Sequence, residues 1–354
     1  MSACTTISLL SRVEVQLCMQ MLDTKSIVAL ALCSRRLFAD ANDTFAFKYA
    51  ALLPIFQHES TYANSLLRFH MNRMITCMTT SDAFAHFETY RTRITHLQFL
   101  QLEIQPNDDD SLYERRISDA LVDNQTLKCV RITYPVATEA FAIHVAHALG
   151  TNTKLQTLIL SSTQVDETGL VALCAAVANN CTLTSLRLTY AGITTYGVRH
   201  VADMLRINNT LTSLYIDGHY YGDEGIVHIA KALQTNTVLI SLDISDNEIT
   251  DTGIKHLAHA LTLNNTLQCM SLRDNIISDD GFLSLANACT MNSSMRAFDM
   301  QWLNITREAI VPFLDICKSF KRNDVQFNIC NNRRIAKSSE PLKNLMNTCK
   351  HLIY

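Results

Sequence analysis

The chain is poor in charge, glycine, proline and tryptophan. Only 18% of its 354 residues are charged, and it has 9 glycines, 5 prolines and one tryptophan. With a hydrophobic content of 48%, this composition argues against an intrinsically disordered chain. The formal net charge of −3 indicates no basic patch of the kind that nucleic-acid binding requires, so we expect no nucleic-acid partner.

Targeting and membrane signals are also missing. The first eight residues contain no basic stretch followed by a long apolar run, so we expect no signal peptide. No apolar run approaches the roughly 18–20 residues of a membrane span, so we expect no membrane partner. The 12 cysteines include no Cys-x-x-Cys pair, and we interpret them as small buried residues in a reducing compartment. We therefore predict a cytoplasmic protein, with the nucleus as the alternative.

One motif recurs every 28 residues through the middle of the chain, and a fixed period in the range of about 20–50 residues is typical of stacked repeats. Its first apolar position is occupied by Leu127, Leu155, Leu183, Leu211, Leu239, Leu267 and Met295. In the clearest copy Leu242 and Ile244 alternate with polar residues, as in a half-buried strand. Ile254, Leu257 and Leu261 then follow at helical spacing. Each repeat is thus predicted to be a strand, a turn, a helix and a turn.

A glycine stands near the start of the predicted helix in five consecutive copies. These are Gly169, Gly197, Gly225, Gly253 and Gly281. A glycine there indicates either a special backbone conformation or a close approach between helix and strand.

The repeats resemble the leucine-rich repeats of the ribonuclease-inhibitor type over roughly residues 97–330. The resemblance implies an α/β solenoid shaped as a horseshoe, with a parallel β-sheet on the concave face and helices on the convex face. In that family an Asn or Cys at the ninth position bonds the backbone of neighbouring turns. Here that column reads Pro135, Thr163, Ala191, His219, Asn247, Asn275 and Leu303. Because only two copies keep Asn, we expect this row of bonds to weaken toward both ends.

The N-terminal segment resembles an F-box. It matches as Leu10-Ser11-x-Val13, then Met21-Leu22-Asp23, then Ser34-Arg35-Arg36-Leu37, although Ser11 replaces the usual proline and Phe47 replaces the late tryptophan. The resemblance implies docking to a Skp-type adaptor of a cullin ubiquitin ligase. The residues expected to make that contact are Leu10, Val13, Leu17, Leu22, Ile27 and Leu30. The alternative is that these residues only cap the first repeat.

We therefore divide the chain into four parts, with a small all-α region before the solenoid. Residues 1–55 form the F-box-like segment, 56–95 a helical linker that caps the first repeat, and 96–330 the solenoid. Residues 331–354 are predicted to form a closing helix, since terminal repeats need caps. Its apolar face would consist of Leu342, Leu345, Met346, Cys349, Leu352 and Ile353.

The partner-binding candidates are polar or aromatic residues at outward strand positions and just after them. Arg, Tyr and Trp are the residue types that most often anchor interfaces, and a broad concave sheet is what such solenoids use to bind partners. The candidates are Arg131, Arg187, Tyr190, Tyr215, Asp243, Asp246, Arg273, Asp274, Asp299 and Trp302. The alternative is an ordinary polar sheet surface.

No phosphate loop, nucleophile elbow or zinc signature is found, so we predict no enzyme, cofactor or metal site. The helix column of His144, His200, His228 and His256 is not expected to share an ion, because packed helices lie about 8–10 Å apart. We predict a non-enzymatic protein-interaction module that acts as an F-box-type substrate receptor. The alternative is a scaffold or regulator of a small GTPase, since the Ran GTPase-activating proteins share this type of repeat.

Overall fold

The computed structural model describes most of the chain after residue 123. The described residues are 77–78, 99–103, 114–115, 118–119, 121–122, 124–133, 139–163, 165–320, 324–332, 335, 346 and 349–353. The F-box-like segment, with its candidate adaptor contacts from Leu10 to Leu30, lies outside them.

Strands and helices alternate along the described chain. The strands are β1 (Cys77–Met78), β2 (Phe99–Glu103), β3 (Cys129–Thr133), β4 (Thr157–Ser161), β5 (Ser185–Thr189), β6 (Ser213–Tyr215), β7 (Ser241–Asp243), β8 (Cys269–Ser271), β9 (Ala297–Asp299), β10 (Gln326–Asn328) and β11 (Leu352–Ile353). The helices are α9 (Glu139–Thr151), α10 (Glu167–Asn179), α11 (Gly197–Ile207), α12 (Gly222–Leu233), α13 (Asp251–Leu263), α14 (Asp279–Met291), the short η2 (Arg307–Ala309) and α15 (Ile310–Cys317).

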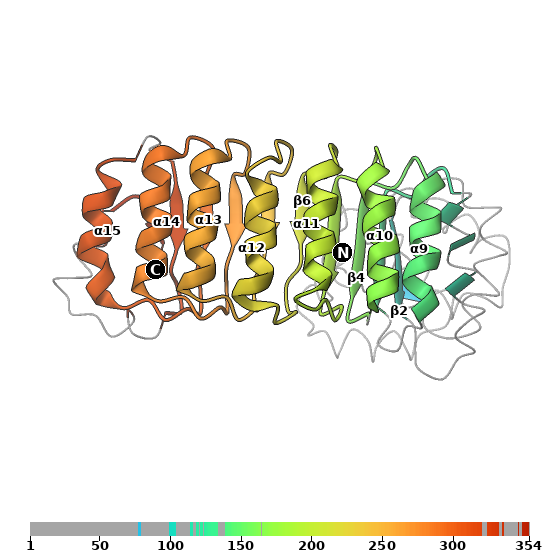
Figure 1. Cartoon of the computed structure of the whole chain (residues 1–354), viewed down its shortest axis with the longest axis horizontal. Coiled ribbons are helices and arrows are strands. Elements are labelled where there is room, and N and C mark those ends of the chain that lie inside the picture. The colour runs from blue at the N-terminus through green and yellow to red at the C-terminus, as the bar shows by residue number, and fades with distance from the viewer. Residues whose placement is uncertain are drawn as a thin grey trace, which may run out of the picture.

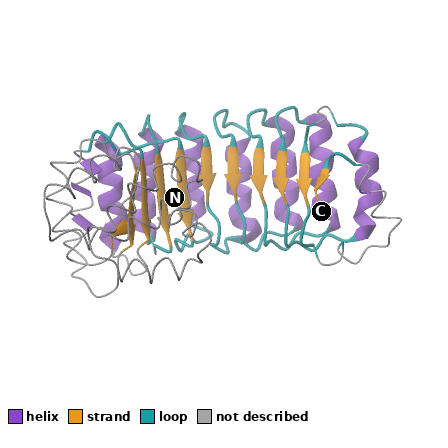
Figure 2. Ribbon diagram, turned by 180° about the vertical axis from the view of Figure 1, so that it is seen from behind, coloured by secondary structure: helices purple, strands orange, loops and turns teal. Residues whose placement is uncertain are grey.

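The strands form one sheet in sequence order, from β1 to β11, and neighbouring strands are parallel. Figure 1 shows the helices side by side on one face of the elongated molecule, and Figure 2 shows the strands on the opposite face. The predicted fold class, a leucine-rich repeat solenoid with a parallel sheet on one side and helices on the other, is confirmed.

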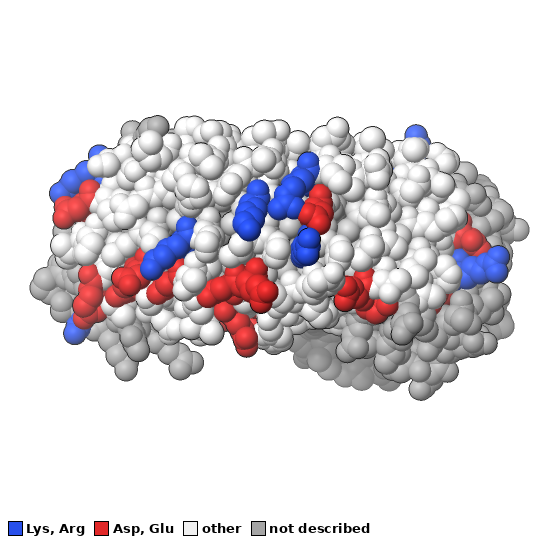
Figure 3. All heavy atoms as spheres, in the orientation of Figure 1, with Lys and Arg blue, Asp and Glu red and all other residues white. Residues whose placement is uncertain are grey.

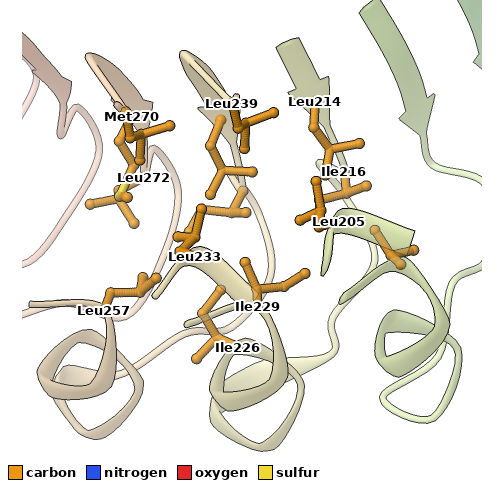
Figure 4. Close-up of a cluster of buried hydrophobic side chains, with 14 of the residues drawn as sticks. Leu205, Leu214, Ile216, Ile226, Ile229, Leu233, Leu239, Leu257, Met270 and Leu272 are labelled. Atoms are coloured by element: carbon orange, nitrogen blue, oxygen red, sulfur yellow. The ribbon is translucent and has the colours of Figure 1, made fainter. Parts of the chain in front are cut away.

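The apolar positions of the repeat form one continuous core between the two layers. Leu214 and Ile216 point from the strand side toward Ile226 and Ile229 of α12, as Figure 4 shows. All four side chains are fully buried. A single repeat has too little apolar surface to bury by itself, so each one depends on its neighbours for its core.

The glycines at the helix starts are explained by close packing between repeats. A Cβ on Gly253 would lie 2.5 Å from Asp223 Oδ1 and 2.6 Å from Ile226 Cγ2, both in the preceding repeat. A Cβ on Gly281 would lie 2.4 Å from Asp251 Oδ1. Neither glycine has a positive φ, so close approach is the reason for glycine at these two positions.

Two end predictions are wrong in part. Cys77–Met78, inside the linker expected to be helical, is strand β1 and pairs with β2. Leu352–Ile353, expected on the closing helix, is strand β11 and pairs with β10. The backbone N–H and C=O groups along a sheet edge need partners, and here short added strands supply them.

A row of buried asparagines links the loops that follow the helices. We call it the loop ladder, and its members are Asn152, Asn180, Asn208, Asn236, Asn264 and Asn292. In a typical rung, Asn264 Nδ2 donates to the carbonyl oxygens of Leu233 (2.8 Å) and Asn236 (2.9 Å) in the preceding repeat. Its Oδ1 accepts from the backbone N–H groups of Thr266 and Leu267, at 3.0 and 2.8 Å. One amide thus joins the end of one helix to the next strand.

Four of these asparagines begin Asn-x-Ser/Thr sequences. In Asn180, Asn208, Asn264 and Asn292 the side-chain nitrogen donates hydrogen bonds to backbone carbonyls of the preceding repeat. These residues are at most 8% exposed. The folded solenoid therefore does not present their amide nitrogens for glycosylation.

The ninth-position column, which we call the turn ladder, is less regular. Asn247 Nδ2 donates to Ile216 O at 2.9 Å, and Asn275 Oδ1 accepts from the N–H groups of Asn247 and Ile249. The expected weakening holds on the N-terminal side, where Thr163 bonds only locally to Ser161 O.

The expected weakening is only partly right at the C-terminal end, where the apolar Leu303 supplies no rung but Asn332 supplies one after it. Asn332, displaced by one residue from the 28-residue lattice, accepts from Leu303 N–H at 3.0 Å and donates to Met300 O at 2.9 Å. This offset is the reason that the fixed period missed it.

His219 replaces asparagine in the turn ladder. Its Nδ1 accepts from Ile193 N–H at 3.2 Å, and its Nε2 lies 2.6 Å from Leu188 O, which requires a proton on Nε2. Both bonds are made only by the neutral ring. Burial, partly offset by the Leu188 carbonyl, lowers the pKa of His219 to about 4.

Candidate protein-binding face

The outward residues of the strands form a continuous row across the sheet. Strand register pairs Arg131 with Ile159, Arg187 with Tyr215, and Tyr215 with Asp243. The full row is Arg131, Ile159, Arg187, Tyr215, Asp243, Ser271 and Asp299. The register thus brings five predicted site residues into one line, and each is partly exposed.

Two aromatic contacts link different repeats near the middle of the sheet. The Arg187 guanidinium carbon lies 4.0 Å from the centre of the Tyr215 ring, a cation–π contact. The Tyr190 hydroxyl donates to Asp246 Oδ2 at 3.2 Å, across an intervening repeat. The Tyr190 ring passes over Gly218, where a Cβ would lie 2.3 Å from Tyr190 Cε1. Gly218 also has a φ of +77°, so both space and backbone conformation require glycine there.

Five predicted site residues lie in turns and not on the strands. Arg273 lies two residues after the end of β8, and the other four share one position of the repeat. Tyr190, Asp246, Asp274 and Trp302 occupy the same position in their repeats and have φ values between +50° and +60°. A left-handed residue ends the extended backbone, so these side chains leave the sheet surface at its edge. They stand just after the outward strand positions, as the sequence pattern predicts, and are exposed or partly exposed.

The C-terminal half of the face carries interacting carboxylates. Burial raises the pKa of Asp274, and the neighbouring Asp246 and Asp299 raise it further, while Arg273 lowers it. Burial also raises the pKa of Asp217, as does Asp243, whereas a hydrogen bond from Thr189 opposes the shift. Arg273 Nε lies 4.0 Å from Asp299 Oδ2, a weak contact between partly exposed groups.

Arg131 and Trp302 stand at opposite ends of the row of candidates. Arg131 is on β3, two strands from Arg187, and its Nε is buried without a hydrogen-bond partner. Trp302 is 44% exposed in the turn after β9. The central candidates Arg187 and Tyr215, and Tyr190 and Asp246, thus contact one another, whereas Arg131 and Trp302 lie away from them.

Three further residues complete this face. Asp217 follows β6, and Tyr220 and Glu248 lie two residues beyond the positive-φ position, with φ values of +58° and +56°. Tyr220 is 59% exposed. Tyr220 and Glu248 are 28 residues apart and so occupy the same position of the repeat. This position lies two residues beyond the last column from which candidates were predicted.

The helix face has a different character. In Figure 3, Lys, Arg, Asp and Glu are scattered among a majority of other residues. His144, His200, His228 and His256 lie on α9, α11, α12 and α13. Within the described ranges, no three His, Cys, Asp or Glu residues are grouped closely enough to hold a metal ion.

The described cysteines are free thiols in mixed surroundings. Cys174 and Cys289 are buried, and burial raises the pKa of each thiol to about 12, whereas Cys181 and Cys269 are exposed. The expectation of buried cysteines is therefore right only for some of them.

No helix in the described part of the chain has both the length and the apolar character of a membrane span.

Comparison with known proteins supports the repeat assignment. The sequence profile described as "Leucine Rich repeat" matches residues 151–174, 179–202 and 235–258. No curated protein matches the sequence. A solved structure of "Leiomodin-1 Actin-Binding Site 2 (ABS2)" is similar at 17% identity and a TM-score of 0.32. The match covers 38% of this chain and 74% of that one, and at this score it carries no argument about function.

Three observations now agree: a 28-residue sequence period, parallel strands in unbroken register, and a matching repeat profile. Solenoids of this kind use their extended surfaces to bind other proteins. The chain contains leucine-rich repeats that form a strand–helix solenoid, which indicates a protein-interaction module.

Proposed function

We propose that this chain is a non-enzymatic recognition protein that holds a protein partner on its sheet face. The observation that carries the proposal is the row in which Arg187, Tyr215 and Asp243 stand side by side on adjacent strands. Arg and Tyr are frequent interface anchors, and the cation–π contact holds this pair in a defined arrangement. The described helices lie on the opposite side of the sheet (Figures 1 and 2) and leave this row uncovered by them.

The partner side is tested with the double variant Arg187→Glu/Tyr215→Ala in the full chain. We expect it to abolish partner capture, because it removes both anchors and reverses one charge. Thermal unfolding should change by only a few degrees, since substitutions of partly exposed residues usually cost little stability. The matched control is Arg206→Glu/Tyr196→Ala, which makes the same changes in the last turn of helix α11 and at the residue before its start. If the control weakens capture as much as the sheet variant, the sheet face is not the binding surface.

We further propose that the N-terminal segment makes the chain an F-box-type substrate receptor of a cullin ubiquitin ligase. The support is the motif around Leu10, Val13 and Leu17, whose apolar residues a small helical segment cannot bury by itself. The full chain should co-purify with a Skp-type adaptor, and Val13→Asp/Leu17→Asp should lose the adaptor but keep the partner. If no adaptor co-purifies, the receptor role falls and a scaffold with an N-terminal cap remains.

A further inference from the structure

The C-terminal half of the sheet face and the turns at its edge have a strong excess of negative charge. On the strands and turns from β6 to β9 the outward positions carry the acids Asp217, Asp243, Asp246, Glu248, Asp274 and Asp299. The same positions carry one basic side chain, Arg273. In the preceding repeats, from β3 to β5, the described outward positions carry Arg131 and Arg187 and no acid. The charge of the face therefore changes sign between β5 and β6.

The acidic half is also bounded by exposed aromatic rings. Tyr190 and Tyr220, at one end, are 51% and 59% exposed, and Trp302 at the other end is 44% exposed. Tyrosine and tryptophan are among the residue types that most often anchor protein interfaces. Their faces attract cations, and arginine in particular stacks on them.

The spacing of these groups fits a short polypeptide segment. Neighbouring strands of a sheet are about 4.8 Å apart, so three strand steps from the β6 turn to the β9 turn span about 15 Å. An extended chain covers that distance in four or five residues. Asp246 and Asp274, on successive turns between the aromatic ends, are one strand step apart.

We propose that the partner held on this face presents a basic segment, rich in arginine or lysine, that lies across the turns from Tyr220 to Trp302. Its cationic groups would pair with Asp246 and Asp274 and stack on the aromatic rings at the two ends. This inference rests on the proposed function and names the chemistry of the partner. The acidic surface also disfavours a nucleic acid at the same place, because phosphates would be repelled.

Trp302 gives a direct test, because it is the only tryptophan of the chain. Its fluorescence is followed while the full chain is titrated with nona-arginine, nona-lysine or nona-glutamate at low and at physiological salt. We expect a saturable change with the basic peptides that weakens with salt, and no change with nona-glutamate. No saturable change with either basic peptide would overturn the inference.

A pair of variants locates the binding. Asp246→Asn/Asp274→Asn keeps the side-chain shape and a residue type that tolerates positive φ, and should weaken nona-arginine binding at least about five-fold. The control Asp203→Asn/Asp315→Asn removes the same charge from helices α11 and α15 and should change it less than about two-fold. Equal effects would show a non-specific charge attraction and would overturn the inference. Thermal unfolding of both variants establishes that each is folded.

The inference and the proposed function can fail separately. If a native partner is captured, is lost in Arg187→Glu/Tyr215→Ala and is indifferent to Asp246→Asn/Asp274→Asn, the basic segment is wrong and the binding face is right. If the sheet variant also leaves capture unchanged, the proposed function fails first.

Discussion

The two ladders that join successive repeats differ in regularity. The loop ladder has asparagine in six consecutive repeats, whereas the turn ladder passes through threonine, alanine, histidine and asparagine. Each loop rung donates to a carbonyl of the preceding helix and accepts from two N–H groups, for which a short side chain with both a donor and an acceptor is required. In the turn ladder His219 can take the place of asparagine, because the two nitrogens of its imidazole ring reach the same kinds of backbone group. The backbone groups that need hydrogen-bond partners, and not the repeat family alone, therefore decide where the same residue must recur.

The largest effect is expected from breaking a loop rung. Asn264→Ala leaves two carbonyls and two N–H groups without their partners at a site that is 3% exposed. Unsatisfied buried groups cost about 1–3 kcal/mol each, and partial relaxation makes a total of about 3–4 kcal/mol the expected loss. Urea unfolding measures it.

The neighbouring residue is a matched control for this loop rung. Asn265 is exposed, and its side-chain amide makes two exposed hydrogen bonds: it donates to Leu263 O and accepts from the Ser293 hydroxyl, each at 3.2 Å. Asn265→Ala should change the free energy of unfolding by about 0.5 kcal/mol or less. Similar losses in both variants would mean that the loop ladder is not what stabilises the repeat junction.

The next effect is the pH dependence of the turn ladder. The folded chain holds the pKa of His219 at about 4, below its ordinary value of 6.5, so between these values the unfolded chain binds a proton that the folded chain does not. Stability contributed by the neutral ring is therefore complete above pH 6.5 and falls as the pH is lowered toward 4, by about 3 kcal/mol in all.

His219→Asn is the comparison for this pH effect. Asparagine supplies the same donor and acceptor without titrating, so the loss between pH 6.5 and pH 4 should shrink by the contribution of His219. Asp217 and Asp274 have raised pKa values, which favour the folded state at low pH. Their contribution is the same in both proteins, so it cancels when the free energies of unfolding are subtracted at each pH. Parallel profiles would contradict the role given to the neutral ring.

A smaller effect is expected at the helix starts. Asp251 Oδ1 accepts from the N–H groups of Ser278 and Gly281, and its Oδ2 from the Ser278 hydroxyl, so it caps the helix of the next repeat. Asp251→Ala should cost about 1–2 kcal/mol in urea unfolding, the range of a lost helix cap. The control is Asp280→Ala, which removes an exposed acid of α14 that does not cap a neighbouring helix. Equal losses of unfolding free energy in the two variants would contradict the capping role of Asp251.

The repeat and the sheet row could be predicted from the sequence because they depend on alternation and period alone. The alternation seen at Leu242 and Ile244 recurs at the equivalent positions of the other copies and predicts a half-buried strand in each. A constant step of 28 residues then places these strands in register. The same 28-residue step predicts that Arg187 and Tyr215 stand side by side on adjacent strands. Strands β1 and β11 could not be found this way, because two-residue strands carry no periodic pattern.

The architecture and the columns of the repeat thus follow from the amino-acid order. The link that Asn264 makes between two repeats, the neutral state of His219 and the positive φ at Asp246 become evident only in the folded chain. The physical reason is that apolar periodicity records what each residue needs locally, namely burial or exposure. Hydrogen bonds between residues 26 to 31 apart depend on how two repeats meet, which becomes visible only when they are stacked.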